Sequence, residues 1–399
     1  MTAAGMGRAE LVTLIGMQAL RIYAGPAALS HIRHHGLQPR DVAVVPGAAG
    51  GPKGLILGPL DRFIFGQWLA PTAHPVHLVG ASIGAWRLAT ACLNDPVEAF
   101  KRLEHDYIHQ HYELQPGQKR PTAEFVSEQF GQSLKTFYGG RVHEVLSHPR
   151  YRLHIVTSRG RHVLGREHKW GTPLGYLGAF LTNSVRRKAM GAWLERVVFS
   201  SGVPTGDGCT PLPFATDDYR TRQVLLSEAN FNPALQASCS IPFMLRSVHN
   251  IPGAPPGAYW DGGITDYHLH LNYASDLVAA GAGDLINTEI APEKTSRAGL
   301  VLYPHFQKAV VPGWLDKNLK WRHKATHFLD NMVLLAPDAS WVKKLPNGKL
   351  PDRSDFTRYG PDRQARAKAW LAATSASEQL ADEFHAWLER PDLARVEAL

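Results

Sequence analysis

Residues 76–89 read VHLVGASIGAWRLA, and the interpretation of the whole chain starts from this stretch. Three of its first four residues are apolar, as is typical of a buried strand, and the residues after Ser82 have the pattern of a helix. Between them lies the motif G-x-S-x-G, whose small residues Gly80 and Gly84 permit a strained turn that exposes the serine hydroxyl. About 0.15 matches to the bare motif are expected by chance in this chain, so the flanking strand and helix carry the prediction. We predict that Ser82 is a nucleophile at the elbow formed by Gly80 and Gly84.

Short apolar runs of the same kind recur along the chain and alternate with longer helical patterns. Several are continuously apolar, which is typical of strands buried on both faces of a sheet that has helices above and below it. The sequence therefore predicts the α/β fold class. The expected strands are residues 42–45, 76–79, 153–157, 223–226, 300–303 and 332–335.

Capping residues and prolines predict several element boundaries. The sequence Asn94-Asp95-Pro96 is expected to end one helix and to start another, with Pro96 at its first position. A helix is expected after Pro233 and before Pro242, and another across residues 361–389. Residues 115–120 and 251–257 are expected to form loops. No linker long enough to separate domains occurs, so we expect one elaborated domain.

The composition excludes several classes of protein. The 399 residues carry 43 Lys and Arg and 35 Asp and Glu, a formal net charge of +8, and 44% are hydrophobic, so the chain is globular. Three scattered cysteines indicate a reducing compartment. No apolar run reaches the roughly 18 residues of a membrane span, and no secretory signal is evident, so we expect a cytoplasmic protein. Nucleic-acid binding is not indicated, because no basic tract is present.

A glycine-rich stretch, PGAAGGPKG at residues 46–54, directly follows the first expected strand. Glycines there allow a tight turn that exposes backbone N–H groups to a negative charge, which could be a phosphate or an oxyanion. A nucleotide-binding P-loop is disfavoured, because Pro52 precedes Lys53 and Gly54 follows it. A glycine-rich turn with no ligand remains the simpler alternative.

Asp261-Gly262-Gly263 is the second candidate for catalytic chemistry. A carboxylate on a glycine-bounded turn can approach a serine hydroxyl directly and act as its general base. His268 and His270 follow shortly afterwards and leave open a triad in which a histidine is the base. An ordinary Asp-Gly turn is the third possibility.

Taken together, these stretches resemble the patatin-like phospholipase family. The glycine-rich loop, G-x-S-x-G and a distant Asp-Gly-Gly occur in the family's order. A small-residue segment that ends in proline, residues 235–242, matches the family's helix before Asp-Gly-Gly. The resemblance covers roughly residues 41–266. It implies a three-layer α/β/α fold with a Ser-Asp dyad that hydrolyses acyl esters of lipids without a cofactor or metal.

The resemblance also implies roles for individual residues. Ser82 corresponds to the nucleophile, Asp261 to the base, and Gly50 and Gly51 to the loop that stabilises the oxyanion. Lys53 and Gly54 correspond to supporting residues of that loop. The chain has Ala48-Ala49-Gly50-Gly51 where the family commonly has three glycines after an acidic residue.

The implied domain organisation is an N-terminal extension and one hydrolase domain. Residues 1–40 have no counterpart in the family, and we expect them to pack on the domain rather than to form a lipid-surface helix. The hydrolase domain is expected at residues 41–399. Its motifs lie in residues 41–266, and its C-terminal strands and helix are expected in residues 299–390.

The expected partner is a lipid or another acyl-ester substrate, and the oligomeric state is open. Trp314 and Trp321 stand among basic residues, which suits peripheral contact with a membrane. His105 and His109 are one helical turn apart, but solvated helix surface is a simpler explanation than a metal site. An acyltransferase that uses the same serine, and a lipid-binding protein with weak turnover, are the alternative functions.

Overall fold

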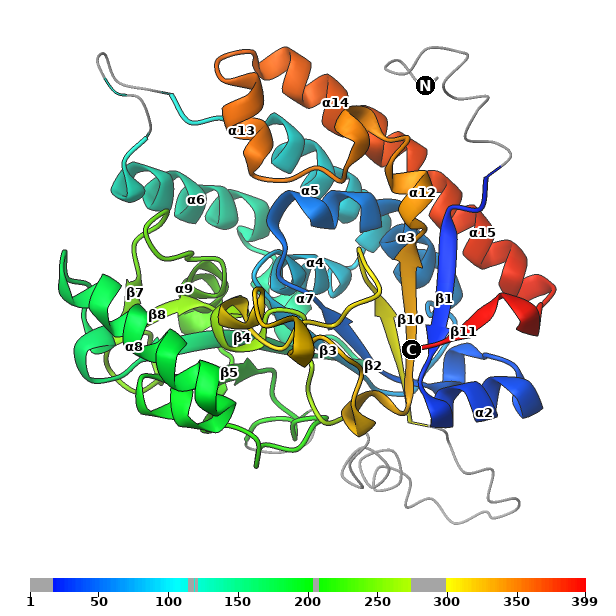
Figure 1. Ribbon diagram of the computed structural model, residues 1–399, viewed down its shortest axis with the longest axis horizontal. Coiled ribbons are helices and arrows are strands. Elements are labelled where there is room, and N and C mark those ends of the chain that lie inside the picture. Colours follow the sequence, from blue (N-terminus) through cyan, green and yellow to red (C-terminus); the bar gives the residue numbers. More distant parts are fainter. Residues whose placement is uncertain (1–16, 114–117, 119–120, 204–207, 274–298) are drawn as a thin grey trace.

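The computed structural model describes residues 17–113, 118, 121–203, 208–273 and 299–399. In this part of the chain, eleven strands form one mostly parallel sheet with the order β11-β1-β10-β9-β2-β3-β4-β5-β6, and β7 and β8 lie off this path (Figure 1). The fold is therefore α/β, as predicted. The strands are β1 (Leu20–Ala24), β2 (Val42–Gly47), β3 (Val76–Ala81), β4 (Tyr151–Gly160), β5 (Leu194–Ser200), β6 (Thr221–Leu225), β7 (Val248–His249), β8 (Ala258–Asp261), β9 (Leu300–Pro304), β10 (Met332–Pro337) and β11 (Val396–Ala398).

The α-helices pack against this sheet and against one another. They are α2 (Pro26–His35), α3 (Gly58–Phe63), α4 (Ile83–Ala91), α5 (Pro96–His109), α6 (Ala123–Tyr138), α7 (Val142–Leu146), α8 (Gly171–Val185), α9 (Glu228–Ser238), α10 (Gly263–Asp266), α12 (Ala339–Val342), α13 (Ser354–Tyr359), α14 (Arg363–Ala376) and α15 (Glu378–Glu389). The 3-10 helices η2 (Gly51–Leu57) and η6 (Trp314–Asp316) border the site described below. No helix in the described ranges has both the length and the apolar character needed to cross a bilayer.

Five of the six predicted strands lie within a longer observed strand, and the sixth, expected at residues 223–226, overlaps β6 but extends one residue past its end at Leu225. Every residue of β5, β9 and β10 is buried, which is the pattern of strands covered on both faces. The prediction missed β5 because its sequence contains Glu195 and Arg196, which are buried in ion pairs. It also missed β1, which pairs with β10 and β11. The sheet therefore includes a strand, β1, from the segment before residue 41.

Two predicted helix boundaries are wrong and one is confirmed. Helix α9 starts at Glu228 and contains Pro233, because Ser227 and Asn230 form a capping box one turn before the proline. The helix expected across residues 361–389 is interrupted at Ser377 and forms α14 and α15. Helix α5 starts at Pro96 as predicted. Residues 251–257 form a loop as expected, and most of the loop expected at residues 115–120 lies outside the described residues.

The long strand β4 brings two distant segments end to end. Along one edge of β4, strand β3 pairs with residues 151–156, up to Ala81 opposite Val156. Strand β8 then pairs with residues 157–159, starting with Asp261 opposite Thr157. It occupies the same edge as β3, because β5 pairs with the other edge of β4 at these positions. Since β8 is antiparallel to β4, the carboxyl ends of β3 and β8 meet.

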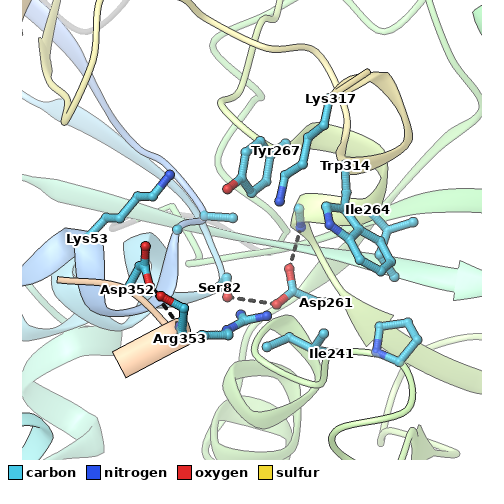
Figure 2. Close-up of a pocket in the computed structure, with 15 residues that line it drawn as sticks. Lys53, Ser82, Ile241, Asp261, Ile264, Tyr267, Trp314, Lys317, Asp352 and Arg353 are labelled. Carbon is cyan, nitrogen blue, oxygen red and sulfur yellow. Dashed lines mark hydrogen bonds between the residues drawn. The ribbon is translucent and has the colours of Figure 1, made fainter. Parts of the chain in front are cut away.

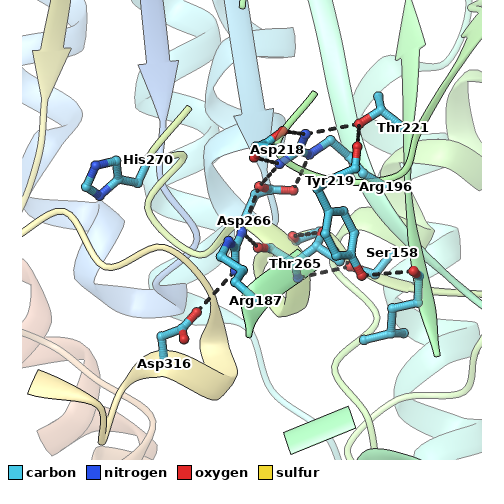
Figure 3. Close-up of polar contacts among 12 residues, drawn as sticks. Ser158, Arg187, Arg196, Asp218, Tyr219, Thr221, Thr265, Asp266, His270 and Asp316 are labelled. Atoms are coloured by element: carbon cyan, nitrogen blue, oxygen red, sulfur yellow. Dashed lines mark hydrogen bonds and ion pairs between the residues drawn. The ribbon is translucent and has the colours of Figure 1, made fainter. Parts of the chain in front are cut away.

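A buried ion-pair network fixes α10 to the sheet (Figure 3). The fully buried Arg196 of β5 donates to both carboxylate oxygens of Asp266, at 2.7 and 2.6 Å, and also to Asp218. Arg187 contacts Asp266 at 3.4 Å and Asp316 of η6 at 3.1 Å. The network thus connects α10, which follows Asp-Gly-Gly, with both the sheet and η6.

We predict that Arg196→Met lowers the free energy of unfolding by about 3–5 kcal/mol, because it leaves a buried carboxylate without its main partner. Urea denaturation measures the loss. Lys101→Met is the control, since Lys101 and Glu98 form an exposed pair whose loss should change the stability by less than about 1 kcal/mol. Equal effects of the two substitutions would contradict a structural role for the network.

Candidate functional site

Ser82 occupies a strained turn between β3 and α4. Its φ of 57° and ψ of −130° lie in a region that residues other than glycine rarely adopt. The turn is possible because α4 comes very close to β2: a Cβ on Gly84 would lie 1.9 Å from the carbonyl oxygen of Gly47. The Ser82 N–H donates to Ser238 Oγ at 2.9 Å, and that hydroxyl donates to the Val156 carbonyl. Ser82 therefore lies at a sharp turn directly between a strand and a helix.

The Ser82 hydroxyl donates directly to Asp261 (Figure 2). The distance from Ser82 Oγ to Asp261 Oδ2 is 2.7 Å, and Asp261 Oδ1 accepts the N–H of Gly263 at 2.7 Å. Both residues are buried. The pair forms because β3 and β8 meet end to end, which places the residue after β3 beside the last residue of β8.

Burial raises the pKa of Asp261, because it removes the carboxylate from water. The hydrogen bond from Ser82 opposes this shift, and so does the positive charge of Arg353. A buried carboxylate with a raised pKa binds a proton more readily than an exposed one, which is the property a general base requires.

The glycine-rich loop borders the same site. Ala49 donates its N–H to the carbonyl oxygen of Tyr267 at 2.9 Å, so this group is already occupied. Among the described residues, the N–H groups of Gly50 and Gly51 have no acceptor. Gly51 adopts a φ of 57°, which a side chain would strain. The N–H group of Ala49 is used within the protein, whereas the N–H groups of Gly50 and Gly51 are available to bind a negative charge in the site.

A cavity of about 330 Å³ opens beside Ser82 and Asp261. Six of its polar or aromatic lining residues, from segments after β8, were not among the predicted site residues. They carry no motif and are distant in sequence, although Trp314 and Lys317 belong to the aromatic and basic segment noted above. Gly54 lies on η2 against Ile83 and does not line the cavity. The lining residues are Ala49, Gly50, Lys53, Ser82, Ile241, Pro242, Asp261, Gly263, Ile264, Tyr267, Trp314, Lys317, Asp352, Arg353 and Ser354.

His268 and His270 bond elsewhere in the structure. His268 Nδ1 contacts the backbone at Ala309 and Val311. His270 contacts the Val310 carbonyl through Nδ1 and the Thr326 hydroxyl through Nε2. Burial lowers the pKa of His270 to about 4 and that of His268 well below its ordinary value. In the described structure, neither imidazole hydrogen-bonds to Ser82 or Asp261.

The histidines and tryptophans that the sequence offered for metal binding or membrane contact lie mostly outside the cavity, and only Trp314 lines it. His105 and His109 stack on the exposed face of α5, with ring centroids 4.4 Å apart. No group of three or more potential metal ligands is found among the described residues. Trp314 is half-buried and lines the cavity, whereas Trp321 is exposed.

Comparisons with known proteins add no further assignment. No protein-family model matches the chain, and no curated protein matches its sequence.

We predict that Gly84→Ala lowers the free energy of unfolding by about 3 kcal/mol or more, because the added methyl group would collide with the backbone of β2. Urea denaturation measures the change. Gly165→Ala is the matched control, since the nearest atom to its added Cβ is 3.7 Å away. A well-folded Gly84→Ala protein of unchanged stability would show that the contact between α4 and β2 is not obligatory.

Proposed function

We propose that the protein is a serine acyl-ester hydrolase of the patatin-like type, with a three-layer α/β/α fold and a Ser-Asp dyad. The observation that carries this proposal is the 2.7 Å hydrogen bond from Ser82 Oγ to Asp261 Oδ2 at a strand-to-helix elbow. The order of the motifs in the sequence supports the same function, as does the cavity beside the pair.

The proposed reaction uses the two side chains in sequence. Asp261 takes the hydroxyl proton as Ser82 Oγ bonds to the ester carbonyl carbon. Collapse of the tetrahedral intermediate expels the alcohol, which takes the proton from Asp261, and leaves an acyl-serine. Water then loses a proton to Asp261 as it attacks this ester, and the acid leaves as Ser82 recovers its proton. No cofactor takes part in these steps.

The N–H groups of Gly50 and Gly51 are the proposed donors to the oxyanion. They have no other acceptor among the described residues, and Gly50 lines the cavity. A donor aimed at this charge typically contributes about 10²- to 10³-fold to the rate. Lys53 is a supporting residue of the loop in this proposal.

A lipid substrate is favoured by an exposed apolar face of α8. Leu174, Leu177, Leu181 and Val185 follow one another at helical spacing, and each is more than half exposed. Four exposed basic residues flank α8 in the sequence, which suits a lipid surface that carries anionic headgroups. They are Arg166, Lys169, Arg186 and Lys188.

Helix α8, which carries this exposed apolar face, lies close to the cavity through its opposite, buried side. Tyr176 of α8 contacts the ring of Phe243 with the centroids 6.0 Å apart, and Phe243 directly follows the lining residue Pro242. Phe243 and Met244 are more than half exposed. We propose that this face, rather than the segment around Trp321, rests on the lipid surface.

We predict that Ser82→Ala lowers kcat for a short-chain ester by about 10³-fold or more, because it removes the nucleophile. Asp261→Asn should cause a comparable loss, because the amide cannot take the proton. An alkyl fluorophosphonate should label Ser82 in the unmodified protein. Product analysis with an added alcohol separates hydrolysis from acyl transfer.

His270→Gln is the control for the dyad, because His270 is buried nearby but bonds to Val310 and Thr326. It should retain most of the turnover, with circular dichroism to check the fold. An inactive but folded His270→Gln protein would contradict the dyad. Binding of an ester without hydrolysis or labelling would instead favour the lipid-binding alternative.

We predict that Leu177→Glu combined with Leu181→Glu reduces sedimentation with vesicles of phosphatidylglycerol and phosphatidylcholine by about tenfold, because two charges enter the apolar face. Leu371→Glu, at an exposed leucine of α14, is the control and should bind as the unmodified protein does. Unchanged binding of the double variant would contradict the proposed surface. A change in oligomeric state by light scattering, without loss of vesicle binding, would identify the face as a contact between copies.

A further inference from the structure

The ring of Phe306 packs directly against Gly50 of the glycine-rich loop. A Cβ on Gly50 would lie 2.6 Å from Phe306 Cε1 and 2.8 Å from its Cζ, which is closer than van der Waals contact allows. The three atoms nearest to that position all belong to this ring. Phe306 is 2% exposed and does not line the cavity. It therefore contacts a proposed oxyanion donor from within the core.

The pairing of β2 with β9 brings these two residues together. The strands are parallel, and Val44 of β2 lies opposite Val301 of β9. The carboxyl ends of neighbouring parallel strands meet at the same edge of a sheet, so the two segments that follow these strands start side by side. Gly50 lies in the segment after β2, and Phe306 lies in the segment after β9. The sheet thus determines a contact that no local motif specifies.

Two buried histidines pack against the Phe306 ring. His305 stacks on it with the ring centroids 4.4 Å apart, and His268 meets it edge to face at 5.2 Å. Each imidazole contacts the backbone through its Nδ1. Burial lowers the pKa of His305 to about 3 and that of His268 well below its ordinary value. Phe306, His268 and His305 therefore form an uncharged aromatic cluster at neutral pH.

This aromatic cluster contacts the glycine-rich loop on both sides of Gly50. Ala49 donates its N–H to the Tyr267 carbonyl oxygen at 2.9 Å, and the Tyr267 ring stacks on the cluster. Lys53 Nζ lies 5.2 Å from the centroid of Phe306. The path of the loop through Gly50 is thus supported by the cluster before, at and after this residue.

The position of Gly50 matters because its N–H is a proposed donor to the oxyanion. Such a donor must come within about 2.7–3.1 Å of the charged oxygen. A displacement of about 1 Å can cost about 10²-fold in rate. Gly50 has no side chain that could anchor it, and its N–H has no acceptor among the described residues. The contact with Phe306 is therefore well placed to fix the position of this donor.

We propose that Phe306 is a positioning residue for the reaction: its ring holds Gly50 so that the Gly50 N–H meets the oxyanion formed when Ser82 attacks the ester. The proposal rests on the hydrolase function and the oxyanion loop proposed above. It also explains why position 50 is a glycine, because any side chain there would collide with the ring.

Phe306→Leu removes Cε1 and Cζ, the two ring atoms closest to Gly50. It should lower kcat for p-nitrophenyl butyrate by about 10- to 100-fold, because the loop can then move away from the oxyanion. KM should change by less than about threefold, since the Gly50 N–H acts on a charge that appears only in the transition state. A change in KM alone would overturn the proposal.

Phe384→Leu is the matched control for lost packing, because Phe384 of α15 is also fully buried but lies outside the cluster. Urea denaturation should show comparable losses of stability in the two variants, whereas kcat of Phe384→Leu should stay within about threefold of the unmodified protein. Equal losses of kcat in the two variants would show that weakened packing alone lowers the rate, and would overturn the proposal.

A size swap between the two residues tests the contact itself. Gly50→Ala should lower kcat by about 10²-fold, because the added methyl group collides with Cε1 and Cζ of Phe306 and displaces the loop. Gly50→Ala combined with Phe306→Leu should recover at least about tenfold of this loss, since leucine lacks both atoms. Gly50→Ala combined with Phe384→Leu should recover none of it. If the losses at positions 50 and 306 multiply instead, the proposal is overturned.

The same measurements separate this proposal from the hydrolase function. Circular dichroism checks the fold, and Phe306→Met, which keeps more of the buried volume, replaces Phe306→Leu in the size swap if the leucine variant unfolds. Turnover by the unmodified protein without recovery in the double variant would overturn only the role of Phe306. No turnover by the unmodified protein would overturn the hydrolase function and the positioning role together.

Discussion

The backbone turn at Ser82 depends on the close approach of α4 to β2, and the geometry of the site follows from it. Where Gly84 faces Gly47, no room remains for a side chain, so the helix can start immediately after the strand. The abrupt change of direction leaves Ser82 at a φ of 57° with its hydroxyl clear of both elements. Strain of this kind persists only when the surrounding packing determines it, and here the buried strands around β3 do so.

The partner of Ser82 is positioned by the sheet and not by its own neighbours in sequence. Strand β3 ends where β8 begins to pair along the same edge of β4, so Asp261 lies beside Ser82 although 179 residues separate them. The buried network of Arg196, Asp266 and Asp218 then fixes the residues that follow Asp261. Arg187 extends this network to Asp316, the residue before Lys317. One set of ion pairs thereby orders both the carboxylate and a cation of the cavity.

In the described structure, the cations of the cavity lack the ion-pair partners that the charges of the Arg196 network have. Each buried charge of the network has an opposite charge in contact, as stable interiors require. The half-buried Lys53 and Lys317 and the exposed Arg353 have none among the described residues, although all three line the cavity beside Ser82 and Asp261. Unsatisfied charge of this kind is typical of functional sites rather than of structural cores.

The sequence by itself determined the features that depend on short-range patterns. The apolar runs predicted the strands around Ser82, and the glycines at positions 80 and 84 predicted the elbow, because a tight turn imposes its requirements on adjacent residues. Motifs of a few residues also identified Asp261 and the loop at Gly50 and Gly51 as candidate site residues.

Only the tertiary structure decided what depends on pairing between distant segments. Strand β5 escaped prediction because burial of Glu195 and Arg196 is possible only with partners supplied by other strands and loops. The direct contact of Ser82 with Asp261 depended on the end-to-end placement of β3 and β8, and no spacing in the sequence specifies that placement. The convergence of Lys317 and Arg353 on the cavity was equally hidden, because each lies on an irregular loop whose path is set by long-range packing.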